Sequence, residues 1–298
     1  MDLDSQQSSF ATYLGALQER ITQALELVDG SARFRNDRWE RPGGGGGNTR
    51  VLEGGTVFEK AAVNVSDVHG DLDSAFAAQL AGEGRAFRAT GLSLVLHPRS
   101  PAVPTVHANF RMIVQGSSAW FGGGSDLTPY LLFEEDCRHF HAVWKAACDA
   151  HDREHYARFK AWCDTYFHLP HREEHRGIGG IFFDTLGAGE PGALAMHDPF
   201  VRTCGDSFLP AYLPIVERRK DLPTTEEDRA WQLMRRGRYV EFNLVYDRGT
   251  TFGLKTRGRT ESILVSLPPV VTFPYSPEPP NDRARALLEV LRTPRDWV

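Results

Sequence analysis

Apolar residues recur every three or four positions near the start of the chain, which is the period of an amphipathic helix. The repeat covers residues 5–28 and is followed by Gly30, and glycine commonly ends a helix. The pattern therefore predicts an N-terminal helix with one apolar stripe packed on the body of the protein. The stripe consists of Phe10, Leu14, Leu17, Ile21 and Leu25.

Other segments alternate apolar and polar residues, which is the period of a β-strand with one buried face. They are residues 56–69, 87–114 and 238–267. In the last segment, the turn residues 247–249 separate two alternating stretches, so we expect an antiparallel hairpin there. Residues 177–184 are typical of a buried strand, whereas residues 120–130, WFGGGSDLTPY, are typical of turns.

The alternation is clearest over residues 106–112. It places His107, Asn109 and Arg111 together on one face of the strand. The opposite face carries only apolar side chains, namely Val106, Ala108, Phe110 and Met112. We therefore expect one face to be core and the other to be a row of hydrogen-bonding groups.

Helical periods return in the second half of the chain. A capping box at Thr224 and Glu227 opens one of these helices, and Gly237 is expected to end it. With no internal repeat and no long linker, we predict one α+β domain over residues 1–298 with a large antiparallel sheet. The predicted helices cover residues 133–149, 154–167, 198–219, 225–236 and 282–292.

A run of five glycines ends a low-complexity segment, RPGGGGG, at residues 41–47. Neither the P-loop spacing nor the dinucleotide-binding spacing of glycines is present. We interpret residues 42–47 as a mobile loop beside a site, or as a linker.

Composition and charge exclude several classes of protein. The 298 residues are 41% hydrophobic and 24% charged, as in ordinary globular domains. No stretch is apolar enough to span a membrane, and the first residues do not resemble a secretion signal, so we expect a cytoplasmic protein. Four cysteines without a C-x-x-C pair fit a reducing compartment, and a net charge of -5 disfavours nucleic-acid binding.

One histidine motif matches a known class of metal site. His171, Glu174 and His175 have the H-x-x-E-H spacing of certain zinc peptidases. That site requires a helix, but Pro170 and the glycines at 177–180 leave little room for one. A solvated charged connector is the alternative interpretation.

Arginines occur repeatedly near glycines and strand ends. A pocket floored by an antiparallel sheet and edged by Arg, Asn and His would suit an apolar ligand with several carboxylates. The arginines are Arg111, Arg172, Arg176, Arg235, Arg236, Arg238, Arg248, Arg257 and Arg259.

Seven motifs, taken in order, resemble the oxygen-dependent coproporphyrinogen III oxidases. The match is collinear from about residue 10 to the last predicted strands, and several motifs in order are more specific than any one alone. The motifs are Gly43–Gly46, Val57–Ala61, Val63–Ser66, Val106–Arg111, Trp120–Pro129, Arg176–Asp184 and Tyr239–Thr250.

The resemblance implies a large antiparallel sheet with helices on both sides, and a homodimer. It also implies the reaction: the propionates on rings A and B of coproporphyrinogen III become vinyls, O2 is consumed, and CO2 and H2O2 are released. The product is protoporphyrinogen IX, on the route to haem, and no organic cofactor is needed. A zinc peptidase and a non-catalytic tetrapyrrole carrier remain as alternatives.

The resemblance also implies residue roles. His107 would be the acid or base, and Asp184 and Arg176 would flank the glycine-rich strand, with the aspartate facing pyrrole N–H groups. The substrate would contact Ser93, Asn109, Phe110, Arg111, Arg257, Gly258 and Arg259.

Bacterial members are proposed to bind a divalent metal such as manganese through four histidines. These correspond to His97, His107, His141 and His171. The chain departs from the family pattern at Thr185, where a second aspartate is common, and at Arg257, where bacterial relatives often have glycine.

Overall fold

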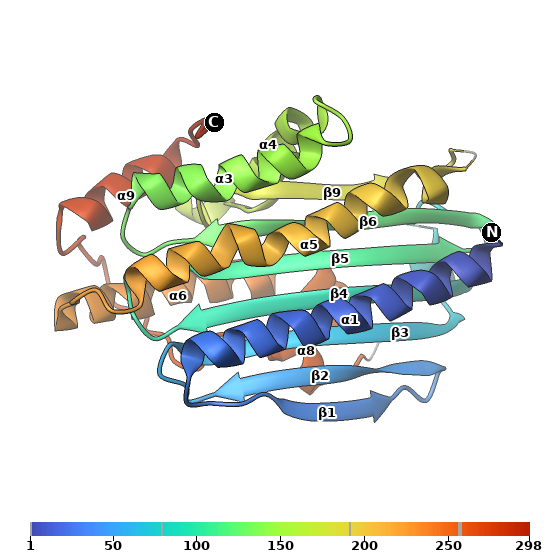
Figure 1. Ribbon diagram of the computed structural model, residues 1–298, viewed down its shortest axis with the longest axis horizontal. Coiled ribbons are helices and arrows are strands. Elements are labelled where there is room, and N and C mark those ends of the chain that lie inside the picture. The colour runs from blue at the N-terminus through green and yellow to red at the C-terminus, as the bar shows by residue number, and fades with distance from the viewer. Residues whose placement is uncertain (1, 79, 191, 256–257) are drawn as a thin grey trace.

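A seven-stranded antiparallel sheet forms the centre of the computed structural model, which describes residues 2–78, 80–190, 192–255 and 258–298 (Figure 1). The first six strands each pair with the next one along the chain, and the seventh joins after a helical block. In spatial order the strands are β1 (Arg35–Glu40), β2 (Gly45–Glu53), β3 (Phe58–Asp71), β4 (Ala86–Pro98), β5 (Thr105–Gln115), β6 (Ser118–Thr128) and β9 (Gly180–Leu186). The predicted α+β fold with a large antiparallel sheet is confirmed.

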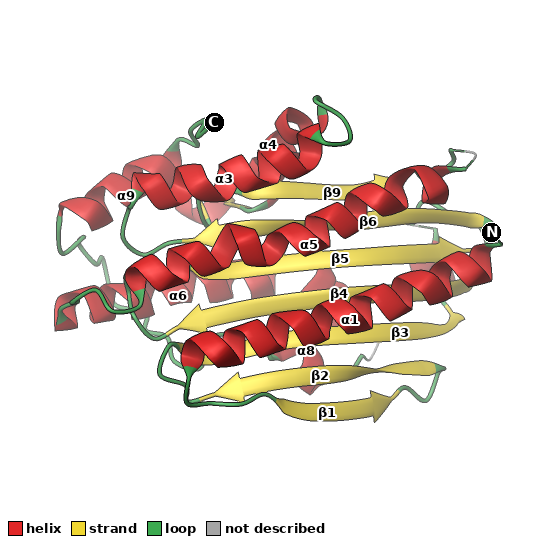
Figure 2. Ribbon diagram, in the orientation of Figure 1, coloured by secondary structure: helices red, strands yellow, loops and turns green. Residues whose placement is uncertain are grey.

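Helices cover both sides of the sheet, as the resemblance implied (Figure 2). Helices α1 (Leu3–Asp29) and α5 (Ala193–Arg219) lie across one side, with α3 (Glu134–Asp149) beside them, and α6 (Glu226–Val245) and α8 (Thr260–Leu264) lie behind the sheet in the same view. The remaining elements are α2 (Ser74–Ala77), α4 (His155–Tyr166), α7 (Arg248–Lys255), α9 (Asp282–Arg292), the 3-10 turn η1 (Pro170–Arg172) and the short pair β7 (His168–Leu169) and β8 (Glu174–His175).

The main core lies between the sheet and helices α1 and α5. We call this side of the sheet the helical face; it carries Leu92, Leu94, Phe110 and Met112. The predicted N-terminal helix is confirmed, and all five residues of its apolar stripe are buried. Its C-cap is Gly30 in the left-handed region, at φ 75°.

Glycine-rich segments form strands rather than the turns and loop expected. Residues 118–128 are β6, although the sequence predicted turns at 120–130, and residues 45–47 of the glycine run belong to β2. At Gly46 a Cβ would lie 2.3 Å from the Trp39 carbonyl oxygen. The glycines therefore allow close backbone contact within a sheet, and the mobile loop predicted at 42–47 is wrong for the residues from Gly45 onward.

The predicted hairpin at 238–267 is also wrong. Helix α6 continues through Gly237 to Val245, and α7 and α8 follow it. Gly237 lies inside the helix rather than at its end, since it is buried against the segment at residue 272. A Cβ at Gly237 would lie 3.0 Å from the Thr272 carbonyl oxygen. The large residues of this stretch also repeat at the helical period, and the N-cap is Thr225, bonded to Asp228, one residue later than expected.

Candidate functional site

The other side of the sheet carries a row of small polar residues. The strand register places Thr49, Asn64, Ser93 and Asn109 on adjacent strands β2 to β5, with Gly124 of β6 next in line. We call this side the polar face. It contains His107, Asn109 and Arg111, as the alternation predicted, because they occupy every second position of β5.

A second row on the polar face is nearly free of side-chain bulk. Ser66, Gly91, Arg111 and Gly122 are register neighbours on β3 to β6. A Cβ at Gly122 would lie 2.7 Å from Arg111 Nε and 2.8 Å from an oxygen of Asp184. The missing side chains at Gly91 and Gly122 therefore leave a shallow surface, which we call the floor, and the Arg111 side chain lies on it across β6.

The segment from α8 onward covers the β2–β4 part of the polar face. The Ser262 hydroxyl lies 2.8 Å from Thr49 Oγ1, and its carbonyl oxygen accepts from Asn64 Nδ2 at 3.0 Å. Lys60 Nζ donates to the Leu267 carbonyl oxygen at 2.9 Å. This segment therefore closes one end of the floor over strands β2 to β4.

The buried polar atoms on the polar face that have no hydrogen-bond partner among the described residues include Asn64 Oδ1, Asn109 Oδ1 and Arg111 Nε. Buried polar atoms are rarely left in this state, because an unmade hydrogen bond costs about 1–3 kcal/mol. The two amide oxygens and the guanidinium Nε among them mark a place where a ligand with N–H groups and anionic oxygens would bind.

His107 is held by a buried ion pair. Its Nδ1 lies 2.9 Å from Asp126 Oδ1, and Arg176 Nη2 donates to both oxygens of Asp126 at 2.7 and 2.9 Å. Burial alone would raise the pKa of Asp126, but Arg176 and His107 outweigh it and hold that pKa below its usual value. An ionised carboxylate only accepts, so the Nδ1 of His107 carries the hydrogen and Nε2 is left for a ligand.

Arg176 does not face the ligand side of the site. Its side chain is only 2% exposed, and its guanidinium lies 4.1 Å from the ring centroid of Phe167 and 4.6 Å from that of Tyr239. Its Nη1 donates to Asn243 at 2.8 Å. Arg176, predicted as catalytic, is therefore placed to position Asp126, and through it His107.

Asp184 lies at the other end of the floor between two arginines. Arg111 Nη2 is 2.9 Å from one of its oxygens, and Arg248 Nη2 is 3.6 Å from the other. The β6–β9 register shifts at this point, between Phe121 and Gly123. Such irregularities often redirect a side chain near a site, and here Asp184 points across β6 toward β5.

The other substrate residues that the resemblance implied have different surroundings. Ser93 lies in the polar row between Asn64 and Asn109, whereas the ring of Phe110 is fully buried in the core of the helical face. Arg259 is paired with Asp37 of β1 at 2.7 Å, and Gly258 packs against Ile263. Arg257 lies outside the described residues.

The four histidines of the implied metal set are held by separate partners. His97 is bonded to Thr105 and the Ser266 carbonyl oxygen, His141 to Tyr156 and the Ile178 carbonyl oxygen, and His171 to Glu241 and Tyr246. Within the described part of the chain, no three His, Cys, Asp or Glu side chains are grouped as a metal ion would need. These residues do not fit one shared metal site, and a need for metal stays a prediction.

The H-x-x-E-H segment does not form the helix that a zinc peptidase requires. Residues 170–172 form η1, and Glu174 begins the short strand β8. Arg235 Nη1 donates to Glu174 at 2.7 Å, and His175 Nδ1 is bonded to the Leu291 carbonyl oxygen at 2.8 Å. His171, Glu174 and His175 therefore have structural partners, and the geometry argues against peptide hydrolysis at this segment.

Sequence reasoning missed the roles of Asp126, Asn64 and Arg248. The signal for Asp126 was present, because in a strand it shares a face with Gly122 and Gly124 and sits opposite His107 in the register. Interpreting residues 120–130 as turns concealed this. Asn64 and Arg248 come together with the site only through strand pairing and helix packing.

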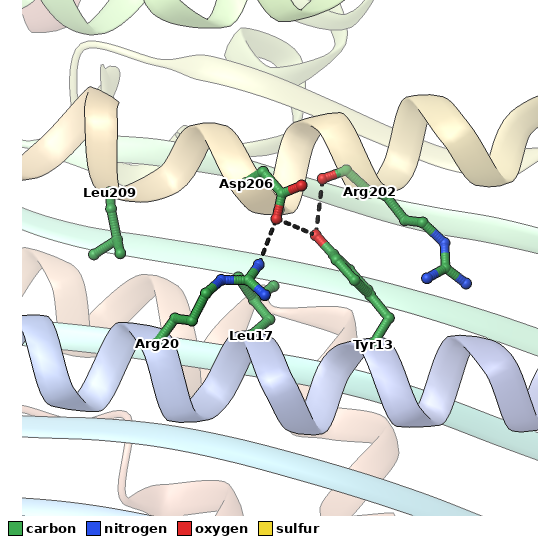
Figure 3. Close-up of a pocket in the computed structure, with 7 residues that line it drawn as sticks. Tyr13, Leu17, Arg20, Arg202, Asp206 and Leu209 are labelled. Carbon is green, nitrogen blue, oxygen red and sulfur yellow. Dashed lines mark hydrogen bonds and ion pairs between the residues drawn. The ribbon is translucent and has the colours of Figure 1, made fainter.

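A groove of about 500 Å³ lies between α1 and α5, outside the helical face (Figure 3). Tyr13 Oη donates to the Arg202 carbonyl oxygen at 2.8 Å, and Arg20 is paired with Asp206 at 2.5 Å. These polar groups satisfy one another, and the sheet separates them from His107. We therefore place the functional site on the polar face.

Two further observations bear on the surroundings in which the chain works. All four cysteines are buried as free thiols. In the part of the chain that the structure describes, no helix is both long and apolar enough to cross a membrane.

Comparison with known proteins identifies the family. The model of the coproporphyrinogen III oxidase family matches residues 9–297 of the chain. Because this match covers nearly the whole sequence, the chain belongs to that family.

Proposed function

We propose that this member of the coproporphyrinogen III oxidase family catalyses the oxygen-dependent form of the reaction. The ring A and ring B propionates of coproporphyrinogen III would become vinyls, giving protoporphyrinogen IX. The observation that carries this proposal is that three buried polar atoms of the polar face, Asn64 Oδ1, Asn109 Oδ1 and Arg111 Nε, have no hydrogen-bond partner in the described part of the chain. The two amide oxygens suit pyrrole N–H groups, and the guanidinium suits a propionate.

The size of the site supports a large ligand with carboxylates at its periphery. Arg259 is anchored on β1 through Asp37, while Arg111 extends from β5 toward Asp184 of β9. Strands β1 and β5 are four positions apart in the sheet, or roughly 19 Å at the usual strand spacing. Cations separated in this way would hold propionates on opposite sides of a tetrapyrrole.

The oxidative decarboxylation of each propionate, which we call one turn of the reaction, balances without an added reductant. A propionate, one O2 and one proton give a vinyl group, CO2 and H2O2. The carboxylate carbon leaves as CO2, the side-chain carbon attached to the pyrrole ring loses a hydrogen, and O2 takes up the two electrons. Two such turns convert the substrate to the product, and the chain's task is to orient the propionate and to move protons.

We assign the proton transfer to Nε2 of His107. With Nδ1 donating to Asp126, the ring is fixed in orientation and in tautomer. The buried Arg176 keeps Asp126 charged, so Asp126 holds the Nδ1 hydrogen and Nε2 is left to accept or donate the proton. Asp126 and Arg176 are positioning residues, and Asp184 is a further member of the site.

The remaining expectations from the sequence and from the resemblance stay proposals. They are a homodimer, a cytoplasmic location, O2 as co-substrate and the absence of an organic cofactor. A divalent metal such as manganese is a further prediction, and none of the steps assigned to His107 or Arg111 depends on it.

The test is turnover of coproporphyrinogen III by metal-stripped protein, in air and under strict anaerobiosis. We expect one CO2 and one H2O2 for each vinyl group formed, hence two of each for every protoporphyrinogen IX, and only in air. Binding of the substrate without release of CO2 in either condition would favour a tetrapyrrole carrier instead. Activity restored only by a divalent ion would make metal part of the mechanism.

A further inference from the structure

We propose that Asp184 is an internal counter-ion, which competes with a substrate carboxylate for Arg111 and Arg248 and so limits how tightly this end of the site binds. The inference rests on the proposed function and assigns a role to a residue of the same site. It differs from the expectation that Asp184 accepts hydrogen bonds from pyrrole N–H groups.

The position of Asp184 depends on a local irregularity in the sheet. The pairing of β9 with β6 slips between Phe121 and Gly123, and Thr185, next to Asp184, has a φ of 53°. Thr185 N donates to Asp184 Oδ1 at 3.0 Å. Together these features aim the carboxylate over Gly122, where no side chain stands between it and Arg111.

The contact between Asp184 and Arg111 uses only part of the guanidinium. It is made by Nη2 at 2.9 Å, while Nε is buried and has no partner among the described residues. A guanidinium binds a carboxylate most strongly through two parallel N–H groups. A guanidinium has five N–H donors, and the Arg111 side chain is 29% exposed, so donors remain for a second carboxylate, which would lie close to that of Asp184.

The charges at this end of the site explain why Asp184 weakens binding. Arg111 and Arg248 contribute two positive charges and Asp184 one negative charge, which leaves a net charge of 2 − 1 = +1. A propionate bound here is attracted by both arginines but repelled by Asp184. Because Arg248 is 64% exposed, solvent screens its contribution, and the balance depends mainly on Arg111 and Asp184.

The experiment compares the affinity of coproporphyrin III for the wild-type chain and for Asp184→Asn. The oxidised porphyrin is stable in air and fluorescent, so a titration gives its Kd without turnover. The variant keeps the side-chain shape and an oxygen that can accept from Thr185, but removes the charge. We expect Kd to fall about fivefold at low salt, with a smaller gain at high salt, because salt screens the repulsion.

A matched control is Asp67→Asn. Asp67 forms an ion pair with Arg88 at 2.6 Å between strands β3 and β4, and both side chains are partly exposed, as in the Asp184–Arg111 pair. Asp67 also accepts from Thr90 and lies on the helical face, away from the proposed ligand. We expect its Kd for coproporphyrin III to equal that of the wild type.

Unchanged or weaker binding by folded Asp184→Asn would overturn the inference, and weaker binding would favour the pyrrole N–H role. If circular dichroism shows that this variant does not fold, Asp184→Ser is measured in the same way. Tighter binding by Asp184→Ser would support the inference, and unchanged or weaker binding would overturn it. A wild-type chain that binds no coproporphyrin III would overturn the proposed function as well. Binding by the wild type with no gain in the variant would overturn this inference alone.

Discussion

The helical face and the polar face of the sheet are built from alternate residues of the same strands, yet their chemistry differs. On β5, Phe110 is fully buried against the helices, whereas Asn109 beside it has a buried oxygen that no other described residue contacts through a hydrogen bond. Packing on the helical face stabilises the fold, because it removes apolar surface from water. The polar face leaves hydrogen bonds unmade, which costs stability and is offset only when a ligand binds.

This difference shows that stability and function are divided between the two sides of single strands. The helical face can anchor α1 and α5 without regard to the ligand. The polar face can keep glycines and unpartnered groups because the other side supplies the packing. Substitutions on one face should therefore affect folding, and those on the other should affect binding and turnover.

The largest expected effect is that of His107→Ala. Loss of a positioned acid or base lowers turnover by about 10²–10⁴-fold, while the Asp126–Arg176 pair remains to hold the fold. The measurement is kcat for coproporphyrinogen III together with urea unfolding. His139→Ala is the control, since His139 bonds to the Pro210 carbonyl oxygen on α5, on the helical side of the sheet. Turnover within tenfold of the wild type would contradict the assignment.

Phe110→Ala should lower stability and leave substrate binding nearly unchanged, which is the opposite of the effect expected for His107→Ala. Removing this ring from the core leaves a cavity and should lower the free energy of unfolding by about 3–5 kcal/mol. At a temperature where the variant stays folded, KM should remain within about threefold of the wild type, because the side chain does not face the ligand. A large rise in KM without loss of stability would show that the two faces are not separate.

A third prediction concerns pH and two buried histidines. Burial lowers the pKa of His97 and of His141 to about 3, from 6.5. The unfolded chain then binds more protons than the folded one between pH 6.5 and 3, so stability falls as the pH falls through this window, by about 1.4 kcal/mol per pH unit for each histidine. Urea unfolding from pH 7 to pH 5 measures the slope.

His141→Gln should reduce this slope by one histidine's share. It should leave KM unchanged, because His141 bonds to Tyr156 and the Ile178 carbonyl oxygen rather than to the polar face. A slope equal to that of the wild type would mean that His141 is already protonated in the folded chain.

The smallest expected effect is that of Asn109→Ala. It tests the division between the two faces, because it should weaken ligand binding while leaving the free energy of unfolding nearly unchanged. Asn109→Ala removes an acceptor that the ligand would use, so Kd for coproporphyrin III should rise about two- to tenfold. The same change removes a buried oxygen with no hydrogen-bond partner in the described structure, so the free energy of unfolding should not fall by more than about 0.5 kcal/mol. A clear loss of stability would show that the oxygen is already satisfied in the free protein.

The sequence alone determined the elements whose evidence is local. The stripe of α1, the helix at 282–292 and the two faces of β5 all follow from the spacing of apolar residues, because burial of one face imposes its period on the chain. The alternation also placed His107, Asn109 and Arg111 together before any strand was paired. The resemblance supplied the family, which the family model then confirmed.

Only the tertiary structure decided what depends on distant partners. Glycine favours turns by its own conformational freedom, yet in β2 and β6 the neighbouring strands approach so closely that no Cβ would fit. Gly237 stays helical because residues 272 and 273 pack on it, and four similar histidines obtain separate partners from separate elements. Strand pairing joined Asp126 to His107 and Asp184 to Arg111, since contact between residues far apart along the chain is set by packing and not by local pattern.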